Sequence, residues 1–402
     1  MLDRIAALGC VICVAWAPGC GPKSPEPRGS DSVEPSAEAA AELERLRALG
    51  YVDYSPEPAA PEDSGVTVHD ERRSYPGYNL YTVRPLGRTE LIDASGNVLN
   101  AWSEQGAEFW SRSLLLDNGD LLVVGAKLPE RYILRFSWAD NGLLWRYPAE
   151  AHHDIRPAPD GRLVTLTMKN RELPEIDPST PVRDNALTFF DPGADEVESL
   201  SLYDVIAASS DVLTLQQVSS KKDLVDLIHA NSLRFMAHPQ LEPRHPMYAP
   251  GNILVCMRNQ DSIALLDPAR RKLVWAWGQG ELEGPHDATM LDDGNILIFD
   301  NGVRRKWSRV VEVDPLSGQI VWEYRAGEPS EFFTASRGGA QRLPNGNTLI
   351  TESNEGHAFE VTPAGEIVWE YFVPHLDAKG HRATIIRLYR HEAGFVEPLL
   401  AR

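Results

Sequence analysis

The feature that most constrains this chain is a strand-and-turn pattern that recurs along it. Four copies begin eight residues before a glycine that follows Asp or Asn, and these glycines are Gly119, Gly161, Gly294 and Gly346. A turn at Asn-Gly or Asp-Gly between apolar runs is a strong signal for a β-hairpin. A fifth copy begins at His229 and is lengthened by an insertion before its turn at Pro-Gly. The chain therefore repeats one small β unit, and we expect an all-β fold.

A second repeated feature is a tryptophan that closes a strand after a turn. These residues are spaced by 43 or 47 positions except across one longer gap, and they are Trp102, Trp145, Trp275, Trp322 and Trp369. The longer gap covers at least one unit that lacks the tryptophan, and residues 189–204 indicate the outer hairpin of such a unit. Periods of about 40 to 50 residues built from strands and turns are typical of a β-propeller.

The repeat predicts the number of blades. Five units begin at residues 111, 153, 229, 286 and 338. A sixth blade can be assembled from strands in residues 79–102 and a strand in 382–390. Closing the ring with both ends of the chain would hide sheet edges that are otherwise exposed. We therefore expect one six-bladed β-propeller over residues 75–402, with seven blades as the alternative if residues 162–228 contain an extra one.

The N-terminal residues differ in composition from the repeats. Residues 5–18 form a short apolar run, and small residues precede Cys20, as in a bacterial lipoprotein signal. We expect residues 1–20 to be an export signal with Cys20 lipidated, so that the protein is periplasmic or a membrane-anchored lipoprotein. Ordinary secretion and a cytoplasmic start are the alternatives. Residues 21–74 are expected to be a flexible tether with a short helix at 37–49.

Charge and cysteine content exclude several classes of partner. The net charge is −19, and a nucleic-acid-binding protein needs a basic surface instead. No run of 18 apolar residues follows the N-terminus, so membrane contact is expected only through the lipid anchor. Cys256 is the only cysteine after residue 20, which excludes a cysteine-based metal site in the body of the chain. We expect no metal and no cofactor.

Three units carry a histidine at the same position of the repeat. His153, His229 and His286 each stand at the start of a unit, which in a propeller lies near one mouth of the central channel. We therefore expect their side chains to converge in space. Convergent imidazoles can bind an oxyanion, move protons near neutral pH or act as nucleophiles. The alternative is a structural role, in which the His-Asp pairs only fasten turns and neighbouring blades.

Several motifs resemble those of one enzyme family. The segments IHANSL, GPHDATMLDDGNILIFDNG and GAQRLPNGNTLITE, with repeated VWEY strand ends, are similar to the bacterial arylsulfotransferases that need no nucleotide sulfate donor. The likeness covers nearly all of the chain after residue 40. It implies an exported six-bladed propeller with its site at the channel. It also implies an enzyme that transfers a sulfuryl group from a phenolic sulfate ester to a phenol through a sulfated histidine.

The resemblance also implies which residues act. The catalytic histidines would be His229, in the H-x-N-S motif, and His286, in the H-D-A motif, while the arginine after F-D-N-G would be Arg304. Arginine offers a fixed fork of donors to two sulfate oxygens, and a second imidazole can move the proton of the phenol. A phenol leaves readily, so no metal is needed. The residues expected to bind the substrate are Asn231, Arg258, His153 and Arg305.

One position departs from the family pattern. The family histidine that takes the sulfuryl group lies in a later blade than His286, where this chain has Gly338. No nearby histidine lies in a matching motif, the candidates being His357, His375 and His381. His229 or His286 would then be the nucleophile, or the chain is a catalytically inactive relative that binds a ligand or a protein. A quinone-dependent dehydrogenase is a further alternative, disfavoured because the sequence has no acidic calcium cluster.

Overall fold

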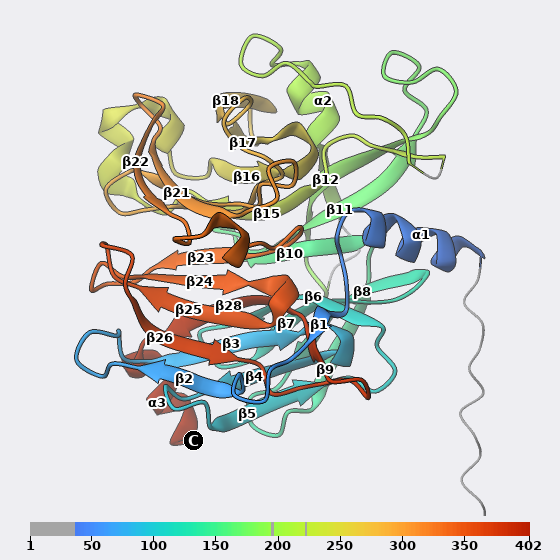
Figure 1. Ribbon diagram of the computed structural model, residues 1–402. Coiled ribbons are helices and arrows are strands. Elements are labelled where there is room, and N and C mark those ends of the chain that lie inside the picture. Colours follow the sequence, from blue (N-terminus) through green and yellow to red (C-terminus); the bar gives the residue numbers. More distant parts are fainter. Residues whose placement is uncertain (1–36, 194–196, 222) are drawn as a thin grey trace, which may run out of the picture. The chain divides into compact units, whose positions relative to one another are not determined.

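The computed structural model describes residues 37–193, 197–221 and 223–402, and these form six blades around a central channel (Figure 1). From the channel outward, the first blade consists of β28 (Ile385–His391), β3 (Tyr78–Val83), β4 (Arg88–Ile92) and β5 (Val98–Ser103). The second consists of β6 (Phe109–Leu115), β7 (Leu121–Lys127), β8 (Glu130–Phe136) and β9 (Leu143–Pro148). The third consists of β10 (Ala151–Pro157), β11 (Leu163–Arg171), β12 (Val182–Phe190) and β13 (Val197–Ser201), with β14 (Val225–Asp226) beside β12.

The other three blades follow the same antiparallel order. The fourth consists of β15 (Ala230–Phe235), β16 (Ile253–Met257), β17 (Ser262–Asp267) and β18 (Lys272–Trp277). The fifth consists of β19 (His286–Met290), β20 (Ile296–Asp300), β21 (Arg309–Asp314) and β22 (Gln319–Tyr324). The sixth consists of β23 (Gly339–Arg342), β24 (Thr348–Glu352), β25 (His357–Val361) and β26 (Ile367–Phe372). Six blades, not seven, are therefore built from the described residues.

The first blade closes the ring with both ends of the chain, as the repeat predicted. β28, near the C-terminus, pairs antiparallel with β3, so that Tyr389 lies opposite Leu80. Helix α3 (Ala393–Leu400) follows β28 and buries Val396 and Leu399. Because each strand of this blade has a partner, closure leaves no inner sheet edge open to another chain.

The repeated tryptophans connect successive blades. Four of the five indole N–H groups donate to backbone carbonyls in the next blade, and the pairs are Trp102 to Ser137, Trp275 to Pro315, Trp322 to Pro363 and Trp369 to Ala94, at 2.8–3.2 Å. The unit without this tryptophan is the third blade, whose outer hairpin β12–β13 ends in helix α2 (Leu202–Ala207). The sequence spacing of the tryptophans therefore reflects a contact between blades.

The segment before the first blade differs from the expected tether. Helix α1 (Ala37–Ala48) agrees with the expected helix. However, β1 (Tyr54–Pro58) pairs with β27 (His381–Ala383), and β2 (Gly65–His69) extends the sixth blade beyond β26. The expectation of a flexible tether is wrong for these residues, because β2 supplies β-branched residues to the open outer edge of a blade. The expected signal, Cys20 and tether residues 21–36 lie outside the described residues.

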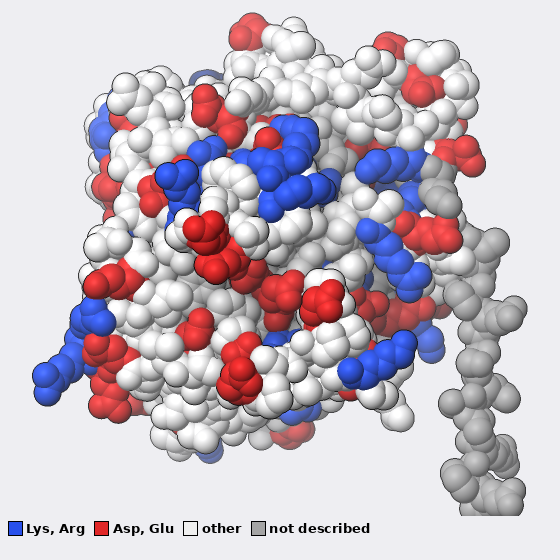
Figure 2. Space-filling model, viewed as in Figure 1, with Lys and Arg blue, Asp and Glu red and all other residues white. Residues whose placement is uncertain are grey.

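The described part of the chain contains no helix that is both long and apolar enough to span a membrane. Figure 2 shows acidic and basic side chains next to one another over the face seen in Figure 1. The acidic excess of the sequence is thus accompanied by basic groups on this face.

Candidate functional site

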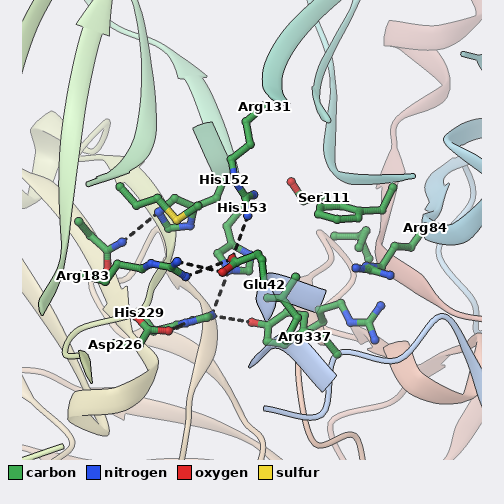
Figure 3. Close-up of a pocket in the computed structure, with 16 residues that line it drawn as sticks. Glu42, Arg84, Ser111, Arg131, His152, His153, Arg183, Asp226, His229 and Arg337 are labelled. Atoms are coloured by element: carbon green, nitrogen blue, oxygen red, sulfur yellow. Dashed lines mark hydrogen bonds and ion pairs between the residues drawn. The ribbon is translucent and has the colours of Figure 1, made fainter. Parts of the chain in front are cut away.

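The starts of three inner strands bring the three predicted histidines together, and Figure 3 shows two of them, His153 and His229, side by side. His153 Nε2 lies 3.1 Å from His229 Nε2, although the two residues are 76 positions apart. His286, the first residue of β19, is linked to His229 by a hydroxyl group that contacts both rings. Each of these strands has a register shift at this end, and His153 and His229 have positive φ values of 61° and 50°. Such bulges redirect side chains, here into the channel.

The hydroxyl group between the histidines belongs to Tyr51, which sequence reasoning missed. Its Oη lies 3.0 Å from His229 Nε2 and 3.2 Å from His286 Nε2. Its ring lies against all three imidazoles, with centroid distances of 5.6–6.5 Å, and is only 5% exposed. Tyr51 lies outside the repeat and just after α1, in the segment LRALGYVDY, which also resembles the family but was given no role in the site.

The hydrogen-bond partners of Nδ1 determine the tautomers of His229 and His286. His229 Nδ1 lies 2.5 Å from the Asp226 carboxylate, which can only accept, so Nδ1 carries a proton. His286 Nδ1 lies 2.7 Å from Asn301 Oδ1. Because the Asn301 amide nitrogen donates to two backbone carbonyls, its oxygen is the acceptor and His286 Nδ1 also carries a proton. In the neutral form of each ring, Nε2 is therefore unprotonated and directed at the Tyr51 hydroxyl.

Burial favours the uncharged forms of these groups. Loss of solvent and the nearby Arg258 hold the pKa of His286 well below its usual range, so this imidazole stays neutral near pH 7. Loss of solvent, with His152 and His229 close by, likewise lowers the pKa of His153. Burial raises the pKa of Tyr51 to about 12 even though Arg258 and Arg337 oppose it. His153 and His286 thus lie as neutral imidazoles beside a neutral phenol.

A second residue that sequence reasoning missed is Arg337. Its backbone N–H donates to His286 Nε2 at 3.2 Å, and its guanidinium group lies 5.5 Å from the Tyr51 ring centroid. It directly precedes Gly338, which stands at the repeat position where the family pattern led us to expect a histidine. A Cβ at Gly338 would come within 2.5 Å of the Phe299 ring, and its φ is +89°, so this position excludes a histidine side chain. The unit that begins at Gly338 therefore brings an arginine to the site, from the residue directly before its start.

The two arginines expected after F-D-N-G lie apart from the histidines. Arg304 donates to Asp261 at 2.8 Å, and its side chain is 62% exposed. Arg305 donates to the carbonyls of Trp307 and Asp300 and packs over the Trp307 ring. Neither guanidinium group contacts a histidine of the site, and the prediction that Arg304 acts beside them is not supported by this geometry.

Asn231 and Arg258, which were also expected to bind the substrate, form hydrogen bonds with backbone next to the site. Asn231 donates through its amide to the carbonyl of Pro285, the residue before His286, and so holds the start of β19. Arg258 donates to the carbonyl of Leu49 at 2.9 Å, and its side chain is largely buried. Asn231 thus contacts the chain that carries a histidine, and Arg258 contacts the segment that carries Tyr51.

The late histidines do not join the site. His357 lies between Glu352 and Glu370, His375 contacts Glu90, and His381 contacts the carbonyl of Ser55. The first contact is an ion pair, because Glu352 and Glu370 outweigh burial and raise the pKa of His357 to about 9. These three histidines are therefore structural in this arrangement. The described residues also contain no group of three or more His, Cys, Asp or Glu side chains that could hold a metal ion.

The aspartates that follow two of the histidines face the channel interior. Asp154 and Asp287 are fully buried, and both accept from Arg234 at 2.7 Å. Tyr389, from β28, also donates to Asp287. In each of these His-Asp pairs, the histidine therefore faces the site, and the aspartate links neighbouring inner strands through its hydrogen bond with Arg234.

Helix α1 covers the site. Glu42 accepts from Arg183 at 2.9 and 3.1 Å and from Arg131 at 3.0 Å, and all three side chains are buried. Burial alone would raise the pKa of Glu42, but the two arginines outweigh it and lower the pKa to about 2. The space left under α1 is about 40 Å³. A water molecule needs about 10–15 Å³ of such space, so only a few waters fit there.

Comparison with known proteins identifies the family. The model of the arylsulfotransferase (ASST) family matches residues 146–373. A search of curated proteins finds no match. Among solved structures, a protein of unknown function from Bacteroides caccae has 15% identity and a TM-score of 0.51, covering 78% of this chain and 98% of its own. This likeness shows the propeller fold alone.

A second solved structure is a catalytically inactive virginiamycin B lyase from Staphylococcus aureus, with quinupristin. It has 12% identity and a TM-score of 0.44, and the match covers 82% of this chain and 91% of that one. The segment matched by the family model spans more than half of the chain and includes His153, His229, His286 and Arg337. The chain therefore belongs to the arylsulfotransferase family.

Proposed function

We propose that this protein transfers a sulfuryl group from an aryl sulfate to a phenol, with a histidine as the temporary carrier. The observation behind the proposal is the pair of Nε2 atoms, on His229 and His286, that face one phenolic oxygen at 3.0 and 3.2 Å. Both rings are held in the tautomer that a nucleophile or a base requires. Arg337 lies beside the same phenol and offers positive charge to a sulfate ester.

His286 is the better nucleophile of the two. Its pKa lies well below the usual range, so Nε2 carries no proton near pH 7, and its lone pair accepts only the hydrogen bond from the Arg337 N–H and the contact with Tyr51. In the first half-reaction, Nε2 attacks the sulfur of the aryl sulfate, and an N–S bond forms. The S–O bond to the aryl group breaks, and its electron pair stays on the phenolic oxygen.

His229 is the better proton carrier, because its Nδ1 proton is bound to the Asp226 carboxylate. That carboxylate stabilises the protonated ring, as in other His-Asp pairs. Protonated His229 gives the Nε2 proton to the departing phenolate. In the second half-reaction, neutral His229 takes the proton of the acceptor phenol while its oxygen attacks sulfur. The N–S bond then breaks, and its electron pair returns to His286 Nε2.

The alternative is a relative that binds aryl sulfates without reacting. One observation favours it: Gly338 stands where the family pattern has the histidine that takes the sulfuryl group. In either case, α1 and Tyr51 leave too little space for a substrate in the docked state. The enzyme interpretation therefore requires that residues 37–53 withdraw before an aryl sulfate can enter. The two interpretations differ in whether sulfuryl transfer occurs after residues 37–53 have withdrawn and an aryl sulfate has bound.

The decisive assay uses 4-nitrophenyl sulfate as donor and phenol as acceptor. We expect release of nitrophenol, and a sulfuryl group on His286 when phenol is omitted, located by peptide mapping under non-acidic conditions. His286→Ala and His229→Ala should each lower the rate by about 10²–10⁴-fold. His69→Ala, an exposed histidine on β2, is the matched control and should have no effect.

One result would count against the enzyme, and another against the roles given to the two histidines. Tight binding of aryl sulfates by a folded protein, with neither nitrophenol nor a sulfated histidine, would support the inactive relative. A sulfuryl group on His229, with activity retained in His286→Ala, would reverse the two roles.

We also propose that the chain is exported and carries a lipid on Cys20, because residues 5–18 and the small residues before Cys20 resemble a lipoprotein signal. Metabolic labelling with a fatty acid and fractionation of the cells would test this. Loss of the label in Cys20→Ala, with release of the protein from the membrane, is the expected result. A protein that stays in the cytoplasm without lipid would overturn it.

A further inference from the structure

The phenol in the candidate site belongs to the chain itself. Tyr51 Oη contacts the Nε2 atoms of His229 and His286, where the proposed function, on which this inference rests, puts the acceptor oxygen. A hydrogen bond to an imidazole nitrogen lies along the direction of its lone pair. A sulfuryl group on His286 would extend along that same direction. Because the docked oxygen lies 3.2 Å from Nε2, it occupies the place that this sulfuryl group would take, and when the segment returns it approaches sulfur from the side opposite to the N–S bond, as displacement requires.

The backbone on both sides of Tyr51 is also bound by the propeller. Leu49 O accepts from Arg258 at 2.9 Å, and Gly50 O accepts from Ser336 Oγ at 2.8 Å. Val52 O accepts from Arg337 at 2.7 Å and from Thr384 Oγ1 at 3.1 Å, and Asp53 O accepts from the Thr384 N–H at 2.9 Å. These donors contact the main chain and not side chains. The rim therefore holds a peptide with its tyrosine inserted between the histidines.

A glycine permits this close approach. Gly50 has φ of +87°, and a Cβ there would lie 2.7 Å from Ala335 Cβ. A side chain at this position would push the peptide away from the rim, and positive φ is costly for other residues. The Gly50-Tyr51 pair is thus shaped to place one phenol deep in the channel mouth.

We propose that Tyr51 is a sulfuryl acceptor within the chain, and that peptidyl tyrosine is an acceptor class of this site. The segment withdraws to admit an aryl sulfate, and His286 takes the sulfuryl group with loss of the phenol. When the segment returns, the Tyr51 oxygen attacks sulfur and its proton passes to His229. The N–S bond breaks, and the product is Tyr51 O-sulfate with neutral His286. The new negative charge lies beside Arg337 and Arg258.

The test incubates the full chain with 4-nitrophenyl sulfate and no added acceptor. We expect a sulfuryl group on Tyr51 by peptide mapping, in addition to the one that His286 retains, formed at a rate per molecule that does not depend on protein concentration. Tyr51→Phe should confine the label to histidine and stop nitrophenol release after about one equivalent. Tyr54→Phe, which removes a second phenol three residues further on, is the matched control and should leave labelling of Tyr51 unchanged.

The outcomes separate this inference from the proposed function. If histidine is sulfated and phenol is turned over but Tyr51 stays unmodified, self-sulfation is refuted and sulfuryl transfer stands. If neither histidine nor Tyr51 is labelled, both proposals fall. Labelling of Tyr51 at a rate per molecule that rises with protein concentration would refute transfer within one chain. A short peptide with the sequence of residues 47–55, offered to Tyr51→Phe, should be sulfated if peptidyl tyrosine is an acceptor class.

Discussion

Removing the charge of Glu42 should release the segment that closes the site. In the docked helix this carboxylate lies between Arg183 and Arg131, and its pKa falls from 4.5 to about 2. At about 1.4 kcal/mol for each unit of pKa, this corresponds to about 3 kcal/mol in favour of the docked state. Glu42→Gln leaves two buried guanidinium groups without their counterion, and the docking equilibrium should weaken about 100-fold.

Hydrogen exchange measures this opening directly. In Glu42→Gln, the protected amides of residues 41–53 should exchange about 100-fold faster, while those of the inner strands should keep their rates. Nitrophenol release from 4-nitrophenyl sulfate should begin faster, since entry no longer waits for a rare opening. Arg47→Gln, a one-charge change on an exposed residue of the same helix, is the control.

The wild-type protein should show the same loosening in acid. Because the folded-state pKa of Glu42 is depressed, its contribution is complete above about pH 4.5 and is lost as the pH falls towards 2. Unchanged exchange of residues 41–53 in Glu42→Gln would refute the reasoning, since the ion cluster would then not hold the helix in place.

Three further predictions concern the scaffold. Gly338→Ala should destabilise the fold in urea by more than Gly365→Ala, although both glycines have positive φ. A Cβ at Gly338 would overlap the Phe299 ring at 2.5 Å, whereas a Cβ at Gly365 would make ordinary contact with the Tyr324 ring at 3.8 Å; equal losses would show that the Phe299 contact relaxes. Trp369→Phe should lower the free energy of unfolding by at least about 1 kcal/mol more than Trp145→Phe in the same assay. The Trp369 side chain is buried, and the substitution removes its 2.8 Å hydrogen bond to the Ala94 carbonyl in the next blade; equal losses would contradict a role for the indole N–H. Because the pKa of His357 is raised to about 9, its ion pairs should contribute up to about 3 kcal/mol to the free energy of unfolding; this contribution is complete below pH 6.5 and is lost as the pH rises through 9. If the difference in unfolding free energy between wild type and His357→Gln is constant from pH 6 to 10, this contribution is excluded.

Sequence patterns located the scaffold well because its signals are local. A turn at Asp-Gly or Asn-Gly needs only neighbouring residues, and its regular return gave the six blades and the joined ends. The same regularity brought out His153, His229 and His286, because equal positions in a closed ring of repeats face one channel. The repeat position at Gly338 carries no histidine for a physical reason, since the Phe299 ring fills the space a side chain would need.

The residues that complete the site could not be found in this way. Arg304 follows a family motif, yet its side chain turns outward to Asp261, while Arg337 follows none and lies at the site. Side-chain direction at a strand end depends on bulges and on neighbouring blades, which a linear pattern does not record.

The sequence by itself therefore determined the repeat, the blade order and the convergence of three imidazoles, because each follows from short-range turn chemistry and periodicity. Only the tertiary structure decided that α1 closes the mouth and that Tyr51 lies between His229 and His286, 178 and 235 residues away. Contacts over such separations arise from ion pairs such as Glu42–Arg183 and from backbone bonds at the rim. Their partners are brought together only when the ring has closed.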